Sequence, residues 1–364
     1  MYGKTIEQLI NSVPPFQQKS NNFIDAMSNF GGWLMSGEGD VLGRKIVKQL
    51  LSINDSLIKC YQLFLQGQTA LCYKRIEKLL YSKREKYPIF KTTKIPKGKF
   101  YYRMRPCDNE YLYSSQELFH IPFEERNKVA NCRFSLSGTP CLYIGSSTYL
   151  CWEELNRPKI ETANVVGIKT LRDLQLIDLR MPTKISDISD YFRIPLIVAC
   201  SVKVTKPIFP FKPEYIIPQA VLHSLISHNN DKGNSSGTKY SGIIYYSTHL
   251  GDEAHYFPTK KLYENIVIPT VNNTINPSAE KIFENGYCPV LCNSFEITDV
   301  VSLNKLRMTG KLQQVKTARS LKQDENCYEI TELHTMEQIL QKTETHKLVP
   351  NKYFKYDKTF DKNY

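Results

Sequence analysis

The stretch RFSLSGTPCLYIGSSTYLCWEEL, residues 133–155, contains a turn, a strand and a helix in succession. The small residues of SLSGTP are typical of a turn, and the apolar run at 141–144 predicts a buried strand. The segment 148–155 predicts a helix on which Glu154 has apolar neighbours: Leu150, Cys151 and Leu155. Because an unpaired buried carboxylate is costly, we expect Glu154 to meet a partner or a ligand.

Similar short patterns surround this stretch between about residues 100 and 269. Apolar and β-branched runs predict strands at 100–102, 174–177, 195–202, 243–246 and 266–268. An amphipathic pattern predicts a helix at 216–227. Strands and a few helices in this order, without a repeated βαβ unit, favour the α+β class.

The first 85 residues predict a small helical bundle. Apolar side chains follow helical spacing at 46–51, 57–65 and 72–80, with an N-cap expected at residues 54–56 and a break at Gly67. Residues 86–99, rich in Lys and Pro, are expected to be a linker to a catalytic domain at 100–270. Residues 271–364 are expected to be an extension that packs on the core and is partly irregular, with a short helix at 336–341.

The chain has 364 residues and a net charge of +12. A basic surface attracts nucleic acid, phosphate ligands or acidic partners. The lysines are scattered, however, and no arginine-rich run or basic helix suited to a DNA groove occurs. A solvated basic face is therefore favoured over nucleic-acid binding, which stays an open alternative.

The ten cysteines have irregular spacing and lie mostly in apolar runs, as expected of reduced thiols in the cytoplasm. Cys288 and Cys292 form a CxxxC pair without a second pair or a suitably spaced His, so no metal site is expected. The N-terminal sequence MYGKTIEQLINSVPPF has no apolar core of a signal peptide. No stretch reaches the roughly 20 apolar residues of a membrane span. We therefore expect a soluble cytoplasmic protein without a membrane partner.

Several common catalytic fingerprints are absent from the sequence: GxxxxGK[ST], GxGxxG, GxSxG and HExxH. What remains is a set of polar residues at the edges of the expected strands and on the 148–155 helix. They are Arg103, Arg105, Arg133, Tyr143, Glu153, Glu154 and Ser247. Taken singly, an Arg at a strand end is usually a salt-bridge partner, and a Glu on an amphipathic helix is usually solvated.

As a set and in this order, these residues resemble the RES domain family, named for its Arg, Glu and Ser. The resemblance covers roughly residues 100–269 and includes Tyr102-Arg103 after a strand, FHIPFEERNKVANCRFS, the 133–155 stretch, SGIIYYS and YENIVIP. Phe134-Ser135 stand where many shorter members carry Trp-Asn. The N-terminal helices resemble the HEPN-like domain that precedes some RES domains.

The RES resemblance implies a mixed β-sheet fold related to ADP-ribosyltransferases and NAD as a substrate, with no further cofactor. By position, it implies catalytic roles for Arg103, Glu154 and Ser247 and NAD binding by Arg133, Tyr143, Arg105 and Tyr102. Glu153 is the adjacent alternative to Glu154. Cleavage of the nicotinamide–ribose bond needs an anion near the ribose and cations at the pyrophosphate, which a Glu and Arg side chains provide. Ser247 suits a hydrogen bond to the nicotinamide amide or a phosphate, and His249 follows two residues later.

Three functions stay open at this point. The leading one is hydrolysis or phosphorolysis of NAD by the toxin of a bacterial toxin–antitoxin or defence system. The second is transfer of ADP-ribose to a protein or nucleic acid. The third is non-catalytic binding of RNA or an antitoxin. An antitoxin protein and further copies of the chain are the partners that these functions imply.

Overall fold

The computed structural model describes residues 22–36, 43–81, 88–107, 112–182, 185, 187–231, 239–249, 263–270, 286–302, 304, 306, 328 and 331–350. The chain forms two compact units. The first contains residues 1–93, 131–136 and 175–248, and the second contains residues 94–130, 137–174 and 249–364. The chain therefore passes from one unit to the other several times.

The first unit begins with three helices, α2 (Phe23–Met35), α3 (Arg44–Leu65) and α4 (Thr69–Tyr81). Asn22 caps α2, because its side-chain oxygen accepts a hydrogen bond from the Asp25 amide at 3.0 Å. Gly67 separates α3 from α4 with a φ of +78°, a conformation that glycine adopts without steric cost. The expected helical region is confirmed, and its likeness to a HEPN domain stays a prediction.

The N-cap expected at residues 54–56 is wrong, because α3 continues through it. Asn54 is buried, and its side-chain amide donates to the Met27 carbonyl on α2 at 3.2 Å. This contact with another helix gives the side-chain amide nitrogen of Asn54 an acceptor outside its own helix. The sequence pattern also did not identify α2.

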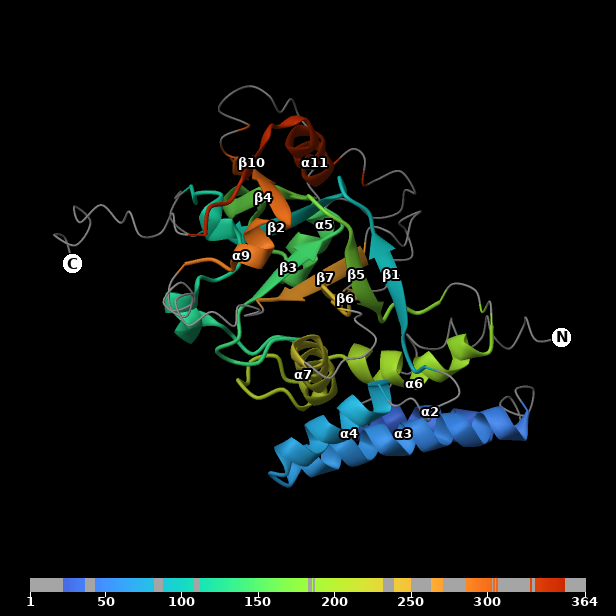
Figure 1. The fold of residues 1–364 in the computed structure, drawn as a ribbon. Helices are drawn as coiled ribbons and strands as arrows, with labels where there is room; N and C mark the ends of the chain where they lie inside the picture. The colour runs from blue at the N-terminus through green and yellow to red at the C-terminus, as the bar shows by residue number, and fades with distance from the viewer. Residues whose placement is uncertain are drawn as a thin grey trace. The chain divides into compact units, whose positions relative to one another are not determined.

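Two further helices of the first unit, α6 (Ser189–Ser201) and α7 (Ile216–Asn230), pack with α2, α3 and α4 (Figure 1). The helix expected at 216–227 is confirmed by α7, but the strand expected at 195–202 is wrong, since these residues lie mostly in α6. Every residue of α6 from Asp190 to Cys200 is buried. An all-round apolar run of this kind does not distinguish a buried helix from a buried strand.

The strands of the first unit are β5 (Leu174–Asp178) and β6 (Gly242–Tyr246), which pair in parallel, and β1 (Lys91–Ile95) beside β5. Both β5 and β6 lie where the apolar runs predicted strands. The expected linker at 86–99 contains β1, whose Lys91 contacts Asp187 and Asp190, each at 2.9 Å. The boundaries of independently folding domains stay a prediction.

The second unit is built on an antiparallel sheet with the order β7-β3-β2-β4-β8-β10, and β9 also pairs with β4. These strands are β2 (Phe100–Pro106), β3 (Cys141–Gly145), β4 (Ala163–Thr170), β7 (Glu264–Pro269), β8 (Phe295–Thr298), β9 (Val301–Ser302) and β10 (Thr345–Lys347). β4 is almost entirely buried, which places it in the core of this unit. The parallel pair of the first unit and these antiparallel pairs confirm the α+β class.

The helices α5 (Thr148–Glu154) and α11 (Glu332–Lys342) pack against each other in the second unit, with β2 under α5 and β4 under α11. The shorter helices are η2 (Gln116–Leu118), η3 (Phe123–Lys128), η4 (Ile160–Thr162) and α9 (Pro289–Cys292), while η5 (Pro213–Tyr215) belongs to the first unit. The expected helix at 336–341 is confirmed by α11. The basic, aromatic C-terminal tail lies outside the described residues.

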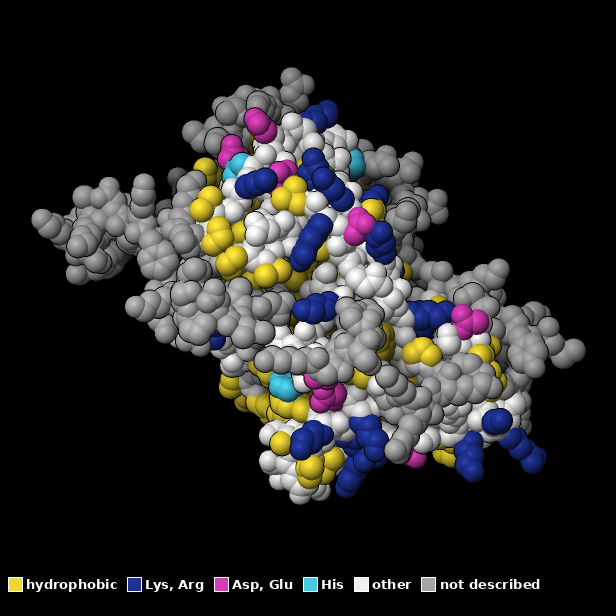
Figure 2. All heavy atoms as spheres, viewed as in Figure 1, with side chains coloured by type: hydrophobic (Ala, Val, Ile, Leu, Met, Phe, Trp, Pro, Cys, Tyr) yellow, Lys and Arg dark blue, Asp and Glu magenta, His cyan; other side chains and the backbone are white. Residues whose placement is uncertain are grey.

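Charged side chains are mixed on the molecular surface. In the view of Figure 2, Lys and Arg side chains stand singly or in small groups with Asp and Glu between them. This distribution agrees with the scattered lysines of the sequence. Among the described residues, no helix combines the length and apolar character that crossing a membrane requires.

Candidate functional site

The position of Glu154 follows from a tight connection between β3 and α5. Ser147 caps α5, because its hydroxyl oxygen accepts from the Leu150 amide at 3.0 Å. The helix then packs closely on the end of β3, where a side chain on Gly145 would begin 3.0 Å from the Cys151 sulfur. A larger residue would make a tight contact here, so Gly145 allows α5 to pack closely on β3.

The C-terminal end of α5 has an unusual backbone. Asn156 and Arg157 both adopt left-handed conformations, with φ of +59° and +56°. Such conformations cost an L-residue roughly 1 kcal/mol or more and are concentrated at functional sites. Their amides donate to the carbonyls of Glu153 and Trp152 at 2.9 and 3.0 Å, which closes the helix directly after Glu154.

The two neighbouring glutamates of α5 have different surroundings. Glu153 is 4% exposed, and its carboxylate binds the guanidinium of Arg157 at 2.9 and 3.0 Å. The Glu154 side chain is 29% exposed, accepts a hydrogen bond from Asn265 Nδ2 at 2.6 Å, and lies 3.7 Å from His249 Nε2. The carboxylate of Glu154 is thus held in place yet reachable, which favours it over Glu153 as the functional residue.

Arg103 lies where two strands separate. β2 and β3 pair at Tyr102 and Gly145, after which β3 continues along β7 and β2 along β4. Directly after this pair, the Arg103 guanidinium donates to the Tyr143 carbonyl of β3 at 2.9 Å. The arginine therefore bridges the two diverging strands.

A cavity of about 340 Å³ lies along the same part of β2. Its charged lining consists of Arg103, Arg105, Lys128, Glu117 and Glu125, and its other lining residues are Met104, Pro106, Phe119, His120, Ile121, Pro122, Leu155 and Tyr287. Arg105 lies 4.2 Å from the centre of the Tyr113 ring, and Lys128 pairs with Glu125 at 2.8 Å. The two arginines give this cavity the planar donor groups that recognise phosphates.

His120 lines this cavity but is suited to a structural role. It is buried, its Nδ1 lies 2.8 Å from the Ile121 carbonyl, and its Nε2 accepts from the Cys288 amide at 2.8 Å. Burial lowers the pKa of His120 to about 3, with a smaller lowering from the charge of Arg103 and an opposing contribution from the Ile121 carbonyl. His120 is therefore neutral near pH 7 and is not a suitable general acid there.

Arg133 belongs to the first unit and is buried there at 6% exposure. Its guanidinium donates to the carbonyls of Cys200 and Val202 at 3.1 and 2.9 Å and to the Thr248 hydroxyl at 2.6 Å. These contacts anchor the residue that follows Ser247. Binding of NAD by Arg133 stays a prediction, and the contacts themselves are those of an arginine that holds a chain segment.

The other predicted residues have the following places. Tyr102 is buried, and its hydroxyl accepts from Gln341 Nε2 at 2.7 Å. Because side chains alternate along a strand, it lies on the opposite face of β2 from Arg103 and Arg105. Tyr143 is half-buried on β3, and Ser247 is half-buried directly after β6 in the first unit. Their expected contacts with NAD stay predictions.

Sequence reasoning missed Asn265, the residue that holds Glu154. It lies on β7 within YENIVIP, where it follows Glu264 and precedes the apolar residues of the strand. A polar residue on a buried strand needs a hydrogen-bond partner, so this position carried a signal. Nothing in the local pattern identified the partner.

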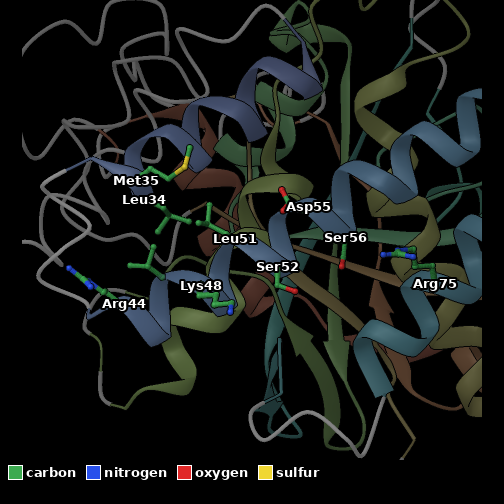
Figure 3. Close-up of a pocket in the computed structure, with 10 residues that line it drawn as sticks. Leu34, Met35, Arg44, Lys48, Leu51, Ser52, Asp55, Ser56 and Arg75 are labelled. Atoms are coloured by element: carbon green, nitrogen blue, oxygen red, sulfur yellow. The ribbon is translucent and has the colours of Figure 1, made fainter.

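A second hollow, of about 720 Å³, lies among the helices of the first unit (Figure 3). It is lined by Leu34, Met35, Arg44, Val47, Lys48, Leu51, Ser52, Asp55, Ser56 and Arg75. None of the residues predicted from the sequence to bind or cleave NAD lines it. Its cations, Arg44, Lys48 and Arg75, are all exposed, as is typical of a surface groove.

Comparisons with known proteins give one clear relative. No protein-family model matches the chain. Over 281 residues the chain is 30% identical to the protein named "Putative toxin YopC" of Bacillus subtilis (strain 168). The matched region covers 70% of this chain and 59% of that protein. The chain thus spans less than two thirds of the length of this relative.

A weaker likeness concerns a solved structure, the crystal structure of the M. tuberculosis MbcT–MbcA toxin–antitoxin complex. The match covers 60% of this chain and 90% of that chain, with 14% identity and a TM-score of 0.31. A TM-score of this size supports no statement about fold or function.

Proposed function

We propose that this chain is a toxin that cleaves the nicotinamide–ribose bond of NAD by hydrolysis or phosphorolysis. The observation that carries the proposal is the placement of Glu154. Its carboxylate is partly exposed and fixed by Asn265, and the next residue, Leu155, lines the cavity that Arg103 and Arg105 also line. Similarity to a protein named a putative toxin and the RES resemblance support the same function.

The bond to nicotinamide breaks through a state in which positive charge develops on the ribose. Glu154 stabilises this charge or binds a ribose hydroxyl and orients the attacking group, as carboxylates do in glycoside cleavage. Asn265 restricts the carboxylate to one orientation, which lowers the cost of organising it during the reaction. The leaving group is a neutral amine and needs no strong acid, so the neutral His120 is compatible with this chemistry.

The arginines act on the other half of NAD in this proposal. The pyrophosphate carries negative charge, and a guanidinium offers two parallel donors to it. Arg103 and Arg105 lie two positions apart on β2, so both side chains leave the same face of the strand. Together they define a short row of donors for the pyrophosphate, with NAD as substrate and no further cofactor.

Incubation of the purified full chain with NAD tests this function. Chromatography with mass spectrometry, with and without added phosphate, measures NAD loss and identifies the product. Nicotinamide with ADP-ribose supports hydrolysis, and nicotinamide with phosphorylated ADP-ribose supports phosphorolysis. Intact NAD under both conditions refutes the proposal and leaves the non-catalytic binding of RNA or an antitoxin.

The same incubation with radiolabelled NAD and a cell extract separates degradation from transfer. Label on a protein or nucleic acid supports the alternative, an ADP-ribosyltransferase. A toxin that consumes its own cell's NAD also requires a neutralising protein, so an antitoxin partner is part of the proposal. An oligomer of this chain stays a prediction.

A further inference from the structure

A buried carboxylate from the C-terminal part of the chain, that of Glu337, contacts the start of α5. Glu337 lies on α11 and is 6% exposed. One of its oxygens accepts a hydrogen bond from the Thr148 amide, the first of α5, at 2.5 Å, and the same oxygen accepts from the Tyr328 hydroxyl. Early helical amides have no partner within the helix, so this carboxylate completes the first turn of α5.

Two other contacts join α11 to the same region. The Thr148 hydroxyl donates to the Leu333 carbonyl of α11 at 2.9 Å. One turn beyond Glu337, Gln341 donates to the Tyr102 hydroxyl on β2. Residues before and after Glu337 on α11 thus hold both α5 and the strand beneath it.

The Glu337 carboxylate is surrounded mainly by hydroxyl, amide and thiol groups. Besides Thr148 and Tyr328, His334 Nδ1 lies 4.0 Å from the second oxygen, and Tyr102 and Cys151 are close enough for their pKa values to be raised by the charge of Glu337. Burial raises the pKa of Glu337 to about 7, although its hydrogen bonds oppose this change. A costly buried acid at a helix start needs a compensating role, and its contacts point to α5.

We propose that Glu337 is a positioning residue that fixes α5 and thereby the carboxylate of Glu154. The inference rests on the proposed cleavage of NAD. Glu337 holds the first residue of α5 and Glu154 is its last, within a helix of seven residues. A helix this short moves as one body. Loss of the hydrogen bond between the Thr148 amide and Glu337 therefore also displaces Glu154. A misplacement of about 1 Å can lower a rate about 100-fold.

Three variants of the full chain separate positioning from general destabilisation. Glu337→Ala removes the acceptor for Thr148, whereas Glu337→Gln keeps an oxygen that can accept the same hydrogen bond. Leu340→Ala is the matched control, because this buried side chain is also on α11 and its loss destabilises the fold without touching the carboxylate. For each variant, kcat and KM for NAD and hydrogen exchange of the amides of residues 148–154 are measured.

We expect Glu337→Ala to lower kcat roughly 10- to 100-fold with KM within about threefold, and to accelerate exchange in α5. Glu337→Gln is expected to restore both to near wild-type values, and Leu340→Ala to leave kcat near wild type. Unchanged exchange in Glu337→Ala, failure of Glu337→Gln to restore kcat, or an equal kcat loss in Leu340→Ala overturns the proposal. If the wild type leaves NAD intact, the proposed function fails, and the exchange comparison alone decides whether Glu337 holds α5.

Discussion

Two arginines that were both expected to belong to the NAD site have opposite surroundings. Arg103 lines a cavity in the second unit, where it bridges two separating strands through a hydrogen bond to the Tyr143 carbonyl at 2.9 Å. Arg133 is buried in the first unit and donates to three protein oxygens. In the sequence both stand at the edge of a strand or turn and both resemble the family's arginines.

The difference shows which observations separate a ligand-binding charge from a structural one. A buried charge must be paired within the protein, whereas a charge that lines a cavity is also within reach of a ligand that enters it. The two glutamates of α5 repeat the contrast, since Arg157 pairs with the buried Glu153 while Glu154 is partly exposed. If this distinction is right, variants of Arg103 at the cavity and of the partly exposed Glu154 affect catalysis, and variants of the buried Arg133 and Glu153 affect stability.

The largest effect is expected at Glu154. Glu154→Gln removes the negative charge near the ribose but keeps the size of the side chain, so NAD cleavage should fall about 1000-fold, corresponding to about 4 kcal/mol. The thermal midpoint should stay close to that of the wild type. The rate of NAD loss and a thermal unfolding curve measure the two quantities.

Glu153→Gln is the matched control for this prediction. It removes the partner of Arg157 at the strained end of α5, so it should lower stability more than Glu154→Gln and lower the rate less. If both variant proteins are folded and the rate of NAD cleavage falls as far in Glu153→Gln as in Glu154→Gln, the assignment of the catalytic role to Glu154 alone is wrong.

The next largest effect concerns Arg133. Arg133→Ala leaves the Cys200 and Val202 carbonyls and the Thr248 hydroxyl without their donor and opens a cavity. We expect a loss of about 3 to 4 kcal/mol in the free energy of unfolding, measured by urea denaturation. Arg103→Ala in the same measurement should lose less than half of this. Equal losses would remove the distinction between the two arginines.

In the second unit, the local sequence patterns predicted β2, β3, β7, α5 and α11, but they did not predict the strands β4, β8, β9 and β10. β3 and α5 follow from an apolar run, turn residues and a helix cap, all within residues 141–154. The failures have physical causes that act over long distances. α6 is apolar on all sides, so its period is hidden, and Asn54 finds its acceptor on another helix.

The residues of the candidate site likewise include some that the sequence pattern pointed to and some that only distant contacts reveal. Residue types and their order predicted roles for Arg103 and Glu154 through a family resemblance, and these roles stay predictions. The contacts made by α5 were not predictable, because Asn265 lies 111 residues from Glu154 and Glu337 lies 189 residues from Thr148 along the chain. Neither forms a local pattern with the residue it holds, and only the folded chain brings each pair together.

The buried carboxyl of Glu337 should make the free energy of unfolding depend on pH. Burial raises its pKa from 4.5 to about 7, so the folded state binds this proton more tightly than the unfolded state. The sign follows from linkage: the stabilising contribution is complete below pH 4.5 and is lost as pH rises to about 7. The free energy of unfolding should therefore fall by about 2 to 3 kcal/mol through this group across the interval.

Glu337→Gln cannot titrate and isolates this contribution. The stability of Glu337→Gln relative to the wild type should increase between pH 4.5 and pH 8 by the same about 2 to 3 kcal/mol, measured by urea denaturation at several pH values. Other titrating groups occur in both proteins and cancel in the difference. A difference that stays constant with pH would mean that the carboxyl titrates normally.

The smallest expected effect distinguishes the two arginines of the cavity. Arg103→Ala removes a fixed donor, so KM for NAD should rise about 10-fold, or about 1.4 kcal/mol, while kcat falls less. Arg105 is exposed and lies over Tyr113, so Arg105→Ala should raise KM only about threefold. Arg103→Lys keeps the charge but loses the planar guanidinium group. Its KM for NAD should therefore lie between the values for Arg105→Ala and Arg103→Ala. An unchanged KM in Arg103→Ala together with a large loss of kcat would place Arg103 at the reacting bond instead of the pyrophosphate, because only an interaction confined to the transition state changes kcat alone.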